Sequence, residues 1–147
     1  MKLNSKIKVR QSLEEVNLFF DEPGNLAKWD RSVAKVIVTT TGSIKEGFTF
    51  DTISPSGLKM SYRVKEYERG KQSKVLLTHS KMFRYAMWQM TFCSIDNETE
   101  IGMNIDLIPK GAYYFLIPIL FFNRKALFTD LTYLQKALDE CFNKQKV

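Results

Sequence analysis

Few residues of this chain have the types and spacing that catalysis requires. His79 is the only histidine, so a metal site built on several histidines is excluded, and Cys93 and Cys141 do not have metal-ligand spacing. His79 falls in a predicted strand, where it could act as a general acid or base, although a surface imidazole is the favoured interpretation. The sequence shows no Gly-rich phosphate loop or CxxC motif, and no Ser-His-Asp arrangement can be argued from it. We therefore predict no catalytic residue, no metal site and no cofactor.

The charged residues also argue against a paired catalytic acid and base. Most carboxylates fall at predicted turns or on the outer face of the strands, and Asp51 should face away from the side on which Phe48 and Phe50 lie. Arg124 stands out because it interrupts the apolar stripe of a predicted C-terminal helix. Its guanidinium could bind a ligand carboxylate or phosphate, or it could lie at the rim of a pocket, which is the favoured interpretation.

The composition fits one domain that spans residues 1–147. The apolar content is 44% and the aromatic content 13%, which argues against disorder. The formal charge is +6, but the basic residues are spread along the chain, so we expect a solvated surface and no nucleic-acid partner. Cys93 and Cys141 lie in apolar segments and are predicted to be buried free thiols in a reducing compartment. The N-terminus has no apolar segment typical of a secretory signal, so we expect a cytoplasmic protein.

Changes in hydrophobic periodicity predict the order of the elements. Alternation over Lys6–Arg10 is typical of a half-buried strand. Ser12 and Glu15 have the spacing of a capping box and begin a short amphipathic helix, which Pro23 and Gly24 end before a second helical turn at 25–29. Short turns then separate six further strands, predicted at 36–41, 48–53, 58–65, 74–80, 85–95 and 99–108. From Leu120 to Cys141 apolar residues recur at three- and four-residue steps, which predicts one helix of about 25 residues packed on the sheet.

This order of elements resembles the polyketide cyclase/dehydrase and lipid-transport superfamily, the START-like (SRPBCC) or helix-grip proteins. The resemblance covers nearly the whole chain, and it rests on a set of local features: Ser12-Leu13-Glu14-Glu15-Val16, Leu26-Ala27-Lys28-Trp29, Gly47-Phe48, Glu98-Thr99-Glu100, Pro118 and the helix with Leu131, Leu134 and Leu138. It implies an α+β fold in which a curved seven-stranded antiparallel sheet wraps around the long C-terminal helix, with two short helices after the first strand. It also implies a cavity for sterols, lipids, polyketides or other apolar molecules.

The residues themselves support a cavity between sheet and helix. The predicted inner face is rich in methionine and aromatic side chains, which adapt to irregular apolar ligands. The same residues could also simply pack a tight core. The ligand-binding residues that we predict are Met60, Tyr62, Trp88, Met90, Phe92, Met103, Ile105, Leu120, Arg124 and Leu127.

Three functions remain open at this point. The leading hypothesis is binding or carriage of an apolar small molecule or lipid, without catalysis. The second is a polyketide cyclase or aromatase-type enzyme, which would need polar side chains in the cavity from the set Tyr62, His79, Tyr85, Gln89 and Arg124. The third is a protein-interaction module like the domains that stimulate the chaperone Hsp90, with a closed cavity.

The apolar segment Tyr113–Phe122 is too short to span a membrane. It could close the mouth of the sheet, form a lid for an apolar ligand, make transient contact with a membrane surface, or be covered by a second subunit in a homodimer. We expect some of Tyr114, Phe115, Ile119 and Phe122 to be exposed in the monomer.

Overall fold

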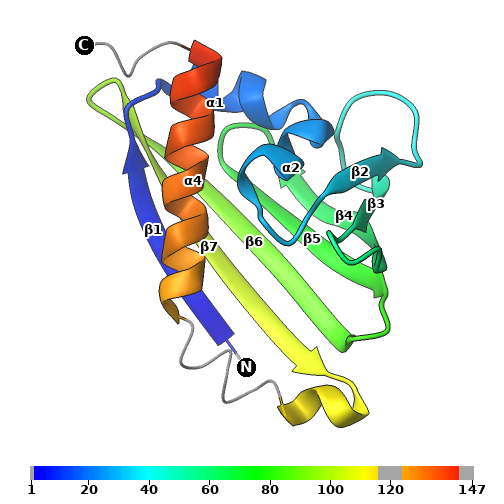
Figure 1. Ribbon diagram of the computed structural model, residues 1–147. Helices are drawn as coiled ribbons and strands as arrows, with labels where there is room; N and C mark the ends of the chain where they lie inside the picture. The colour runs from blue at the N-terminus through cyan, green and yellow to red at the C-terminus, as the bar shows by residue number, and fades with distance from the viewer. Residues whose placement is uncertain (1, 116–123, 143–147) are drawn as a thin grey trace.

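One antiparallel sheet forms the frame of the molecule (Figure 1). The computed structural model describes residues 2–115 and 124–142, with side chains from Leu131 onward in the second range. Neighbouring strands follow the order β1-β7-β6-β5-β4-β3-β2, so β1 and β2 are the edges. The predicted seven-stranded sheet is confirmed, and its strands are β1 (Lys2–Val9), β2 (Lys35–Val38), β3 (Thr49–Ile53), β4 (Lys59–Glu68), β5 (Gln72–His79), β6 (Phe83–Ile95) and β7 (Glu98–Pro109).

Two short helices separate the first two strands, as predicted. The capping box begins α1: the Glu15 amide donates to Ser12 Oγ over 3.3 Å, and the Ser12 amide donates to Glu15 Oε1 over 3.1 Å. Pro23 at the first position of a 3-10 turn then redirects the chain into the second helix. The helical elements are α1 (Leu13–Phe20), η1 (Pro23–Asn25), α2 (Leu26–Trp29), η2 (Gly111–Phe115) and α4 (Arg124–Phe142).

The helix α4 lies along the β1–β7 side of the sheet, whereas α1 and α2 lie toward its middle (Figure 1). Leu131, Leu134 and Leu138 are fully buried on its inner face, where they form a core cluster with residues of β1, α1 and β7 such as Val9 and Ile101. The spacing of the three leucines puts them on one face of the helix, as their periodicity predicted. No helix among the described residues is both long and apolar enough to cross a membrane.

A buried polar network fixes the C-terminal half of α4 to the end of β1. Asp139 is 4% exposed, and its Oδ1 accepts hydrogen bonds from Gln11 Nε2 and Gln135 Nε2, both over 2.8 Å. Its Oδ2 accepts from Arg10 Nη2. The Thr99 hydroxyl of β7 donates to the Gln11 carbonyl over 2.9 Å and ties the sheet into the same network. Burial of the carboxylate is thus compensated by three donors.

Two strand boundaries differ from the prediction. β1 begins at Lys2, four residues earlier than expected, because pairing with β7 extends from Lys2↔Asp106 to Val9↔Thr99 whatever the polarity of Asn4 and Ser5. β2 ends at Val38 although the β-branched sequence continues. Beyond β2, the Thr49 amide donates to Thr40 Oγ1 over 2.9 Å. A side-chain oxygen therefore replaces the backbone carbonyl that would accept this hydrogen bond in a continued strand.

The prediction of buried cysteines is wrong, since Cys93 and Cys141 are both free and exposed. Cys93 follows Phe92, which faces inward, so the alternation of β6 turns the thiol outward. Cys141 lies in the last turn of α4, after the buried Leu138 and Asp139. Apolar neighbours in the sequence indicated burial, but strand alternation turns Cys93 outward and helical spacing places Cys141 off the buried face of α4.

Candidate functional site

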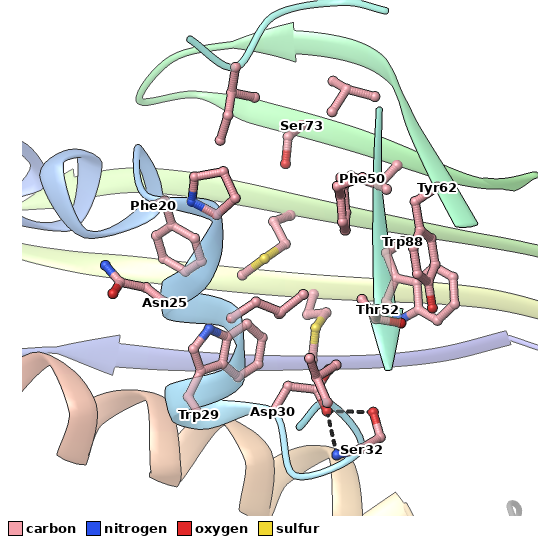
Figure 2. A pocket seen from close by; sticks show the side chains of 18 of the residues that line it. Phe20, Asn25, Trp29, Asp30, Ser32, Phe50, Thr52, Tyr62, Ser73 and Trp88 are labelled. Carbon is pink, nitrogen blue, oxygen red and sulfur yellow. Dashed lines mark hydrogen bonds between the residues drawn. The ribbon is translucent and has the colours of Figure 1, made fainter. Parts of the chain in front are cut away.

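A cavity of about 490 Å³ lies between the sheet and the segment that contains α1, η1 and α2. Its walls come from β3 to β7 on one side and from the short helices and the loop before β3 on the other. Figure 2 shows side chains of both walls converging on the same space. The cavity therefore lies where α1, η1 and α2 face the sheet.

The sheet wall contains seven of the predicted ligand-binding residues. Cross-strand pairing brings them together, because Trp88 is opposite Ile105 and Met90 is opposite Met103. They occupy alternate positions along β4, β6 and β7, so one face of the sheet carries the whole set. These residues are Met60, Tyr62, Trp88, Met90, Phe92, Met103 and Ile105.

Among the described residues, the short helices and the loop after them supply the opposite wall. Phe20, Leu26, Trp29 and Val33 line the cavity there. The described side chains of α4, which begin at Leu131, do not line it, and Leu131 is fully buried in the core. The predicted residues Leu120, Arg124 and Leu127 lie outside the side chains that the structure describes. Aromatic residues on both sides of the Pro23-Gly24 break were the signal that could have located this wall.

Aromatic rings form two groups on the cavity walls. In one, Phe50 stacks on Tyr62 with ring centroids 5.2 Å apart, and Tyr62 meets Trp88 edge-on at 5.3 Å. In the other, Phe20 meets Phe92 at 5.3 Å and Trp29 at 6.3 Å, both edge-on. These contacts hold the rings in place, so the apolar surface is present before any ligand arrives.

Tyr62 is a buried polar group of the cavity wall, and it is 7% exposed. Burial raises the pKa of Tyr62 to about 12; the hydrogen bond with Thr52 lowers it, and the negative charge of Asp30 raises it further. The phenol is therefore neutral at physiological pH. Its hydroxyl also points to Met60 Sδ, 3.9 Å away.

Asp30 follows α2 and lies at the edge of the cavity beside Trp29 (Figure 2). Its Oδ1 accepts from the Ser32 amide over 2.9 Å and from Ser32 Oγ over 2.6 Å. The chain turns tightly here, with the Val33 amide donating to the Asp30 carbonyl over 3.0 Å. The sequence did not predict Asp30 and Ser32 as site residues, because polar residues after a helix ordinarily indicate a solvated turn.

The turn between β4 and β5 closes one end of the cavity against α1. Gly70 has φ +79°, and a Cβ there would lie 3.0 Å from the Asn17 side-chain amide, so the approach requires glycine. Arg69 holds the turn in place: Nη2 donates to Asp21 Oδ2 over 2.8 Å and lies 3.5 Å from Glu14 Oε1.

The polar residues weighed for catalysis lie mostly elsewhere. His79 is exposed and Tyr85 half-buried, and neither lines the cavity. Gln89 faces away and donates to Gln72 Oε1 over 3.4 Å. Asp51 also faces outward, as expected, with Lys59 Nζ 3.4 Å away. The described residues contain no cluster of three side chains that could hold a metal ion.

The described part of the Tyr113–Phe122 segment is the 3-10 turn η2, and it is exposed. Tyr113 and Tyr114 are exposed, and Phe115 is 82% exposed. The expectation of exposed aromatic side chains is confirmed for Tyr114 and Phe115, whereas Ile119 and Phe122 lie outside the described residues.

Comparison with known proteins gives a relationship at the level of the fold. The chain matches no protein-family model and no curated protein. Among solved structures, a protein from Thermus thermophilus is similar at a TM-score of 0.79 and 8% identity, over 96% of this chain and 99% of that one. A START superfamily protein from Mycobacterium smegmatis is similar at a TM-score of 0.71 and 14% identity, over 95% and 94% of the two chains.

A third similar structure is norcoclaurine synthase from Thalictrum flavum in complex with dopamine and hydroxybenzaldehyde. Its TM-score is 0.69 at 12% identity, and the match covers 100% of this chain and 88% of that one. Identities this low relate the backbones and not the functional side chains. With its sheet, two short helices and long C-terminal helix in the same arrangement, the chain has the helix-grip fold of the START-like proteins.

Proposed function

We propose that the protein binds and carries an apolar small molecule or lipid in the cavity between the sheet and the short helices. The observation that carries this proposal is the cavity of about 490 Å³ with its Met- and aromatic-rich wall. Helix-grip folds are known for binding hydrophobic ligands, and a preformed apolar space with a few polar groups is typical of ligand sites. We propose the predicted residues of the sheet wall as ligand contacts; for Leu120, Arg124 and Leu127 that role stays a proposal from sequence.

Displacement of a neutral fluorescent reporter tests the proposal. N-phenyl-1-naphthylamine becomes brighter in an apolar site, so we expect saturable fluorescence with the purified protein. Met90→Trp adds bulk inside the cavity and should weaken reporter binding roughly tenfold, about 1.4 kcal/mol. Met87→Trp is the matched control, since Met87 is on the same strand and does not line the cavity.

Two results would contradict carriage. One is the absence of saturable fluorescence together with the absence of any small-molecule adduct in native mass spectrometry of the freshly purified protein. The other is an equal effect of Met90→Trp and Met87→Trp, which would place the reporter outside the cavity.

The arrangement supports carriage better than the two alternatives. Of the five polar residues that a cyclase or aromatase could use, Tyr62 is the one that the described structure places in the cavity, and its phenol holds its proton. An interaction module with a closed core would lack the cavity that the described residues enclose.

We also propose that η2 docks on an anionic membrane during ligand transfer. The η2 patch (Tyr113, Tyr114 and Phe115) is exposed beside the exposed side chains of Lys81, Arg84 and Lys110. Aromatic side chains flanked by basic ones are typical of surfaces that bind anionic lipid.

The η2 patch adjoins one end of the cavity. The Lys110 amide, just before η2, donates to the Met82 carbonyl over 2.9 Å, and Arg84 Nη2 donates to Tyr114 Oη over 3.3 Å. Met82 and Phe83 line the cavity, so a ligand leaving at this end would meet the docked surface. Cosedimentation with lipid vesicles tests the proposal, and self-association through the η2 patch would contradict it.

A further inference from the structure

The charge of the cavity is opposite to the charge of the protein. The chain has a formal charge of +6, yet the cavity is lined by Glu22, Asp30 and Glu68, and no described Lys, Arg or His side chain lines it. Glu22 and Glu68 are exposed, and Glu68 lies 3.6 Å from Lys71. Asp30 is the carboxylate that is half-buried, so it dominates the field inside the cavity.

The Asp30 carboxylate has capacity left for a ligand. Both hydrogen bonds that it accepts from Ser32 end on Oδ1, and no described residue donates to Oδ2. The neighbouring Arg31 packs on the Tyr133 ring of α4, 4.9 Å from its centroid. The half-buried Asp30 carboxylate would bind most tightly a ligand that is positively charged and donates a hydrogen bond to Oδ2.

The other polar groups of the same wall also accept hydrogen bonds. The Asn25 amide nitrogen donates one of its two hydrogens to the Phe19 carbonyl over 2.7 Å, and the carboxamide oxygen of Asn25 can accept from a ligand. Asn25 and Asp30 lie on either side of Trp29 (Figure 2). Faces of indole and phenol rings attract cations, and Trp29, Tyr62 and Trp88 all line the cavity.

We propose that the cavity selects an apolar molecule with a protonated nitrogen, held at Asp30 Oδ2 between aromatic walls, and discriminates against apolar carboxylates. The inference rests on the proposed carriage function and adds the chemical class of the ligand. Desolvating a ligand carboxylate next to Asp30 is unfavourable because no described cation of the cavity compensates it.

Three probes with the same alkyl chain test this selectivity: dodecylamine, dodecan-1-ol and dodecanoate. Each probe is titrated against the complex of the wild-type protein with N-phenyl-1-naphthylamine at neutral pH. The concentration of each probe stays below its critical micelle concentration. We expect the amine to bind about tenfold tighter than the alcohol, as a charge-assisted hydrogen bond provides, and the carboxylate to bind more weakly than the alcohol.

Asp30→Asn removes the charge and keeps an oxygen to accept from Ser32, so the turn should be retained. We expect this variant to lose the tenfold preference for the amine and to bind dodecan-1-ol as the wild type does. Asp51→Asn is the matched control, because Asp51 lies on β3 and faces away from the cavity. The Asp51→Asn variant should keep the preference for the amine. Melting curves of each variant report whether it is folded.

The outcomes separate the two proposals. If the reporter binds and dodecanoate displaces it as well as the amine does, the selectivity is overturned while carriage stands, and a cation outside the described lining, such as Arg124, would be the anchor. An unchanged preference in Asp30→Asn would also overturn it, and the wild-type comparison is decisive even if that variant fails to fold. If the reporter does not bind at all, carriage itself fails.

Discussion

At the scale of single residues, Tyr62 shows how burial decides the chemistry of a side chain. Its hydroxyl lies in an apolar wall near a carboxylate, and both features favour the neutral phenol. A phenol that holds its proton up to about pH 12 is a poor general base at physiological pH. It can still act as a hydrogen-bonding group that orients a ligand.

We expect one tyrosine to ionise near pH 12 in an ultraviolet titration and this transition to be absent in Tyr62→Phe. Since the pKa of the folded state lies above that of the unfolded state, the folded protein binds more protons between pH 10 and 12. Stability should therefore fall as the pH rises, by about 1.4 kcal/mol per unit. Tyr114→Phe, which removes an exposed hydroxyl, is the control. Ionisation of every tyrosine near pH 10 would contradict this picture of the site.

At the scale of elements, the short helices contribute to both the core and the cavity. The helix α4 packs on the β1–β7 side through Leu131, Leu134 and Leu138 and is held by the Asp139 network. Phe19 of α1 and Trp29 of α2 join that core and also line the cavity. Aliphatic packing holds α4 against the sheet, whereas the network specifies its register, because its hydrogen bonds are satisfied in one position only.

Asp139→Ala should lower the free energy of unfolding by about 3 kcal/mol, because the buried Gln11 amide and the Arg10 guanidinium lose their acceptor. Urea denaturation measures the loss as a lower midpoint at unchanged slope. Glu140→Ala changes the adjacent, exposed carboxylate and should be nearly neutral. A loss below about 1 kcal/mol for Asp139→Ala would show that packing alone positions α4.

The sequence could predict the local features of the fold. Alternation indicated the strands and the inward side of β4, β6 and β7, and the spacing of Ser12 and Glu15 indicated the capping box. The sequence did not indicate that the short helices line the cavity, because the pattern around Trp29 predicts burial without saying which partner covers the side chain. Asp30 was missed because its place in the cavity depends on α2 lying over the sheet, which is a long-range contact.

At the scale of the whole molecule, the signs of charge are separated. The surface near η2 carries Lys81, Arg84 and Lys110, while Glu22, Asp30 and Glu68 line the cavity. Basic residues around η2 favour the approach of an anionic surface, and the cavity carboxylates favour a cationic ligand over an anionic one, as we propose. The exposed Phe115 supplies the apolar contact that charge alone does not.

We expect the protein to cosediment with vesicles of phosphatidylcholine and phosphatidylserine in equal amounts far more than with phosphatidylcholine alone. Arg84→Gln should lower binding to the anionic vesicles about fivefold, which is about 1 kcal/mol, and Phe115→Ala by a similar factor. Arg63→Gln and Leu18→Ala alter exposed residues of the same types away from η2 and serve as controls. Equal losses in variant and control, or dimers that dissociate in Phe115→Ala, would contradict membrane docking.

The placement of the cavity under α1, η1 and α2 has a consequence for how such a protein changes over time. Asn25, Ser32 and Met60 touch the cavity but do not belong to the buried core cluster around α4. Substitutions at these positions can alter the ligand while the core that folds the chain stays intact. Such positions can diverge in sequence and change what the cavity accepts, while the shared residues Phe19, Trp29 and Met103 keep the core in place.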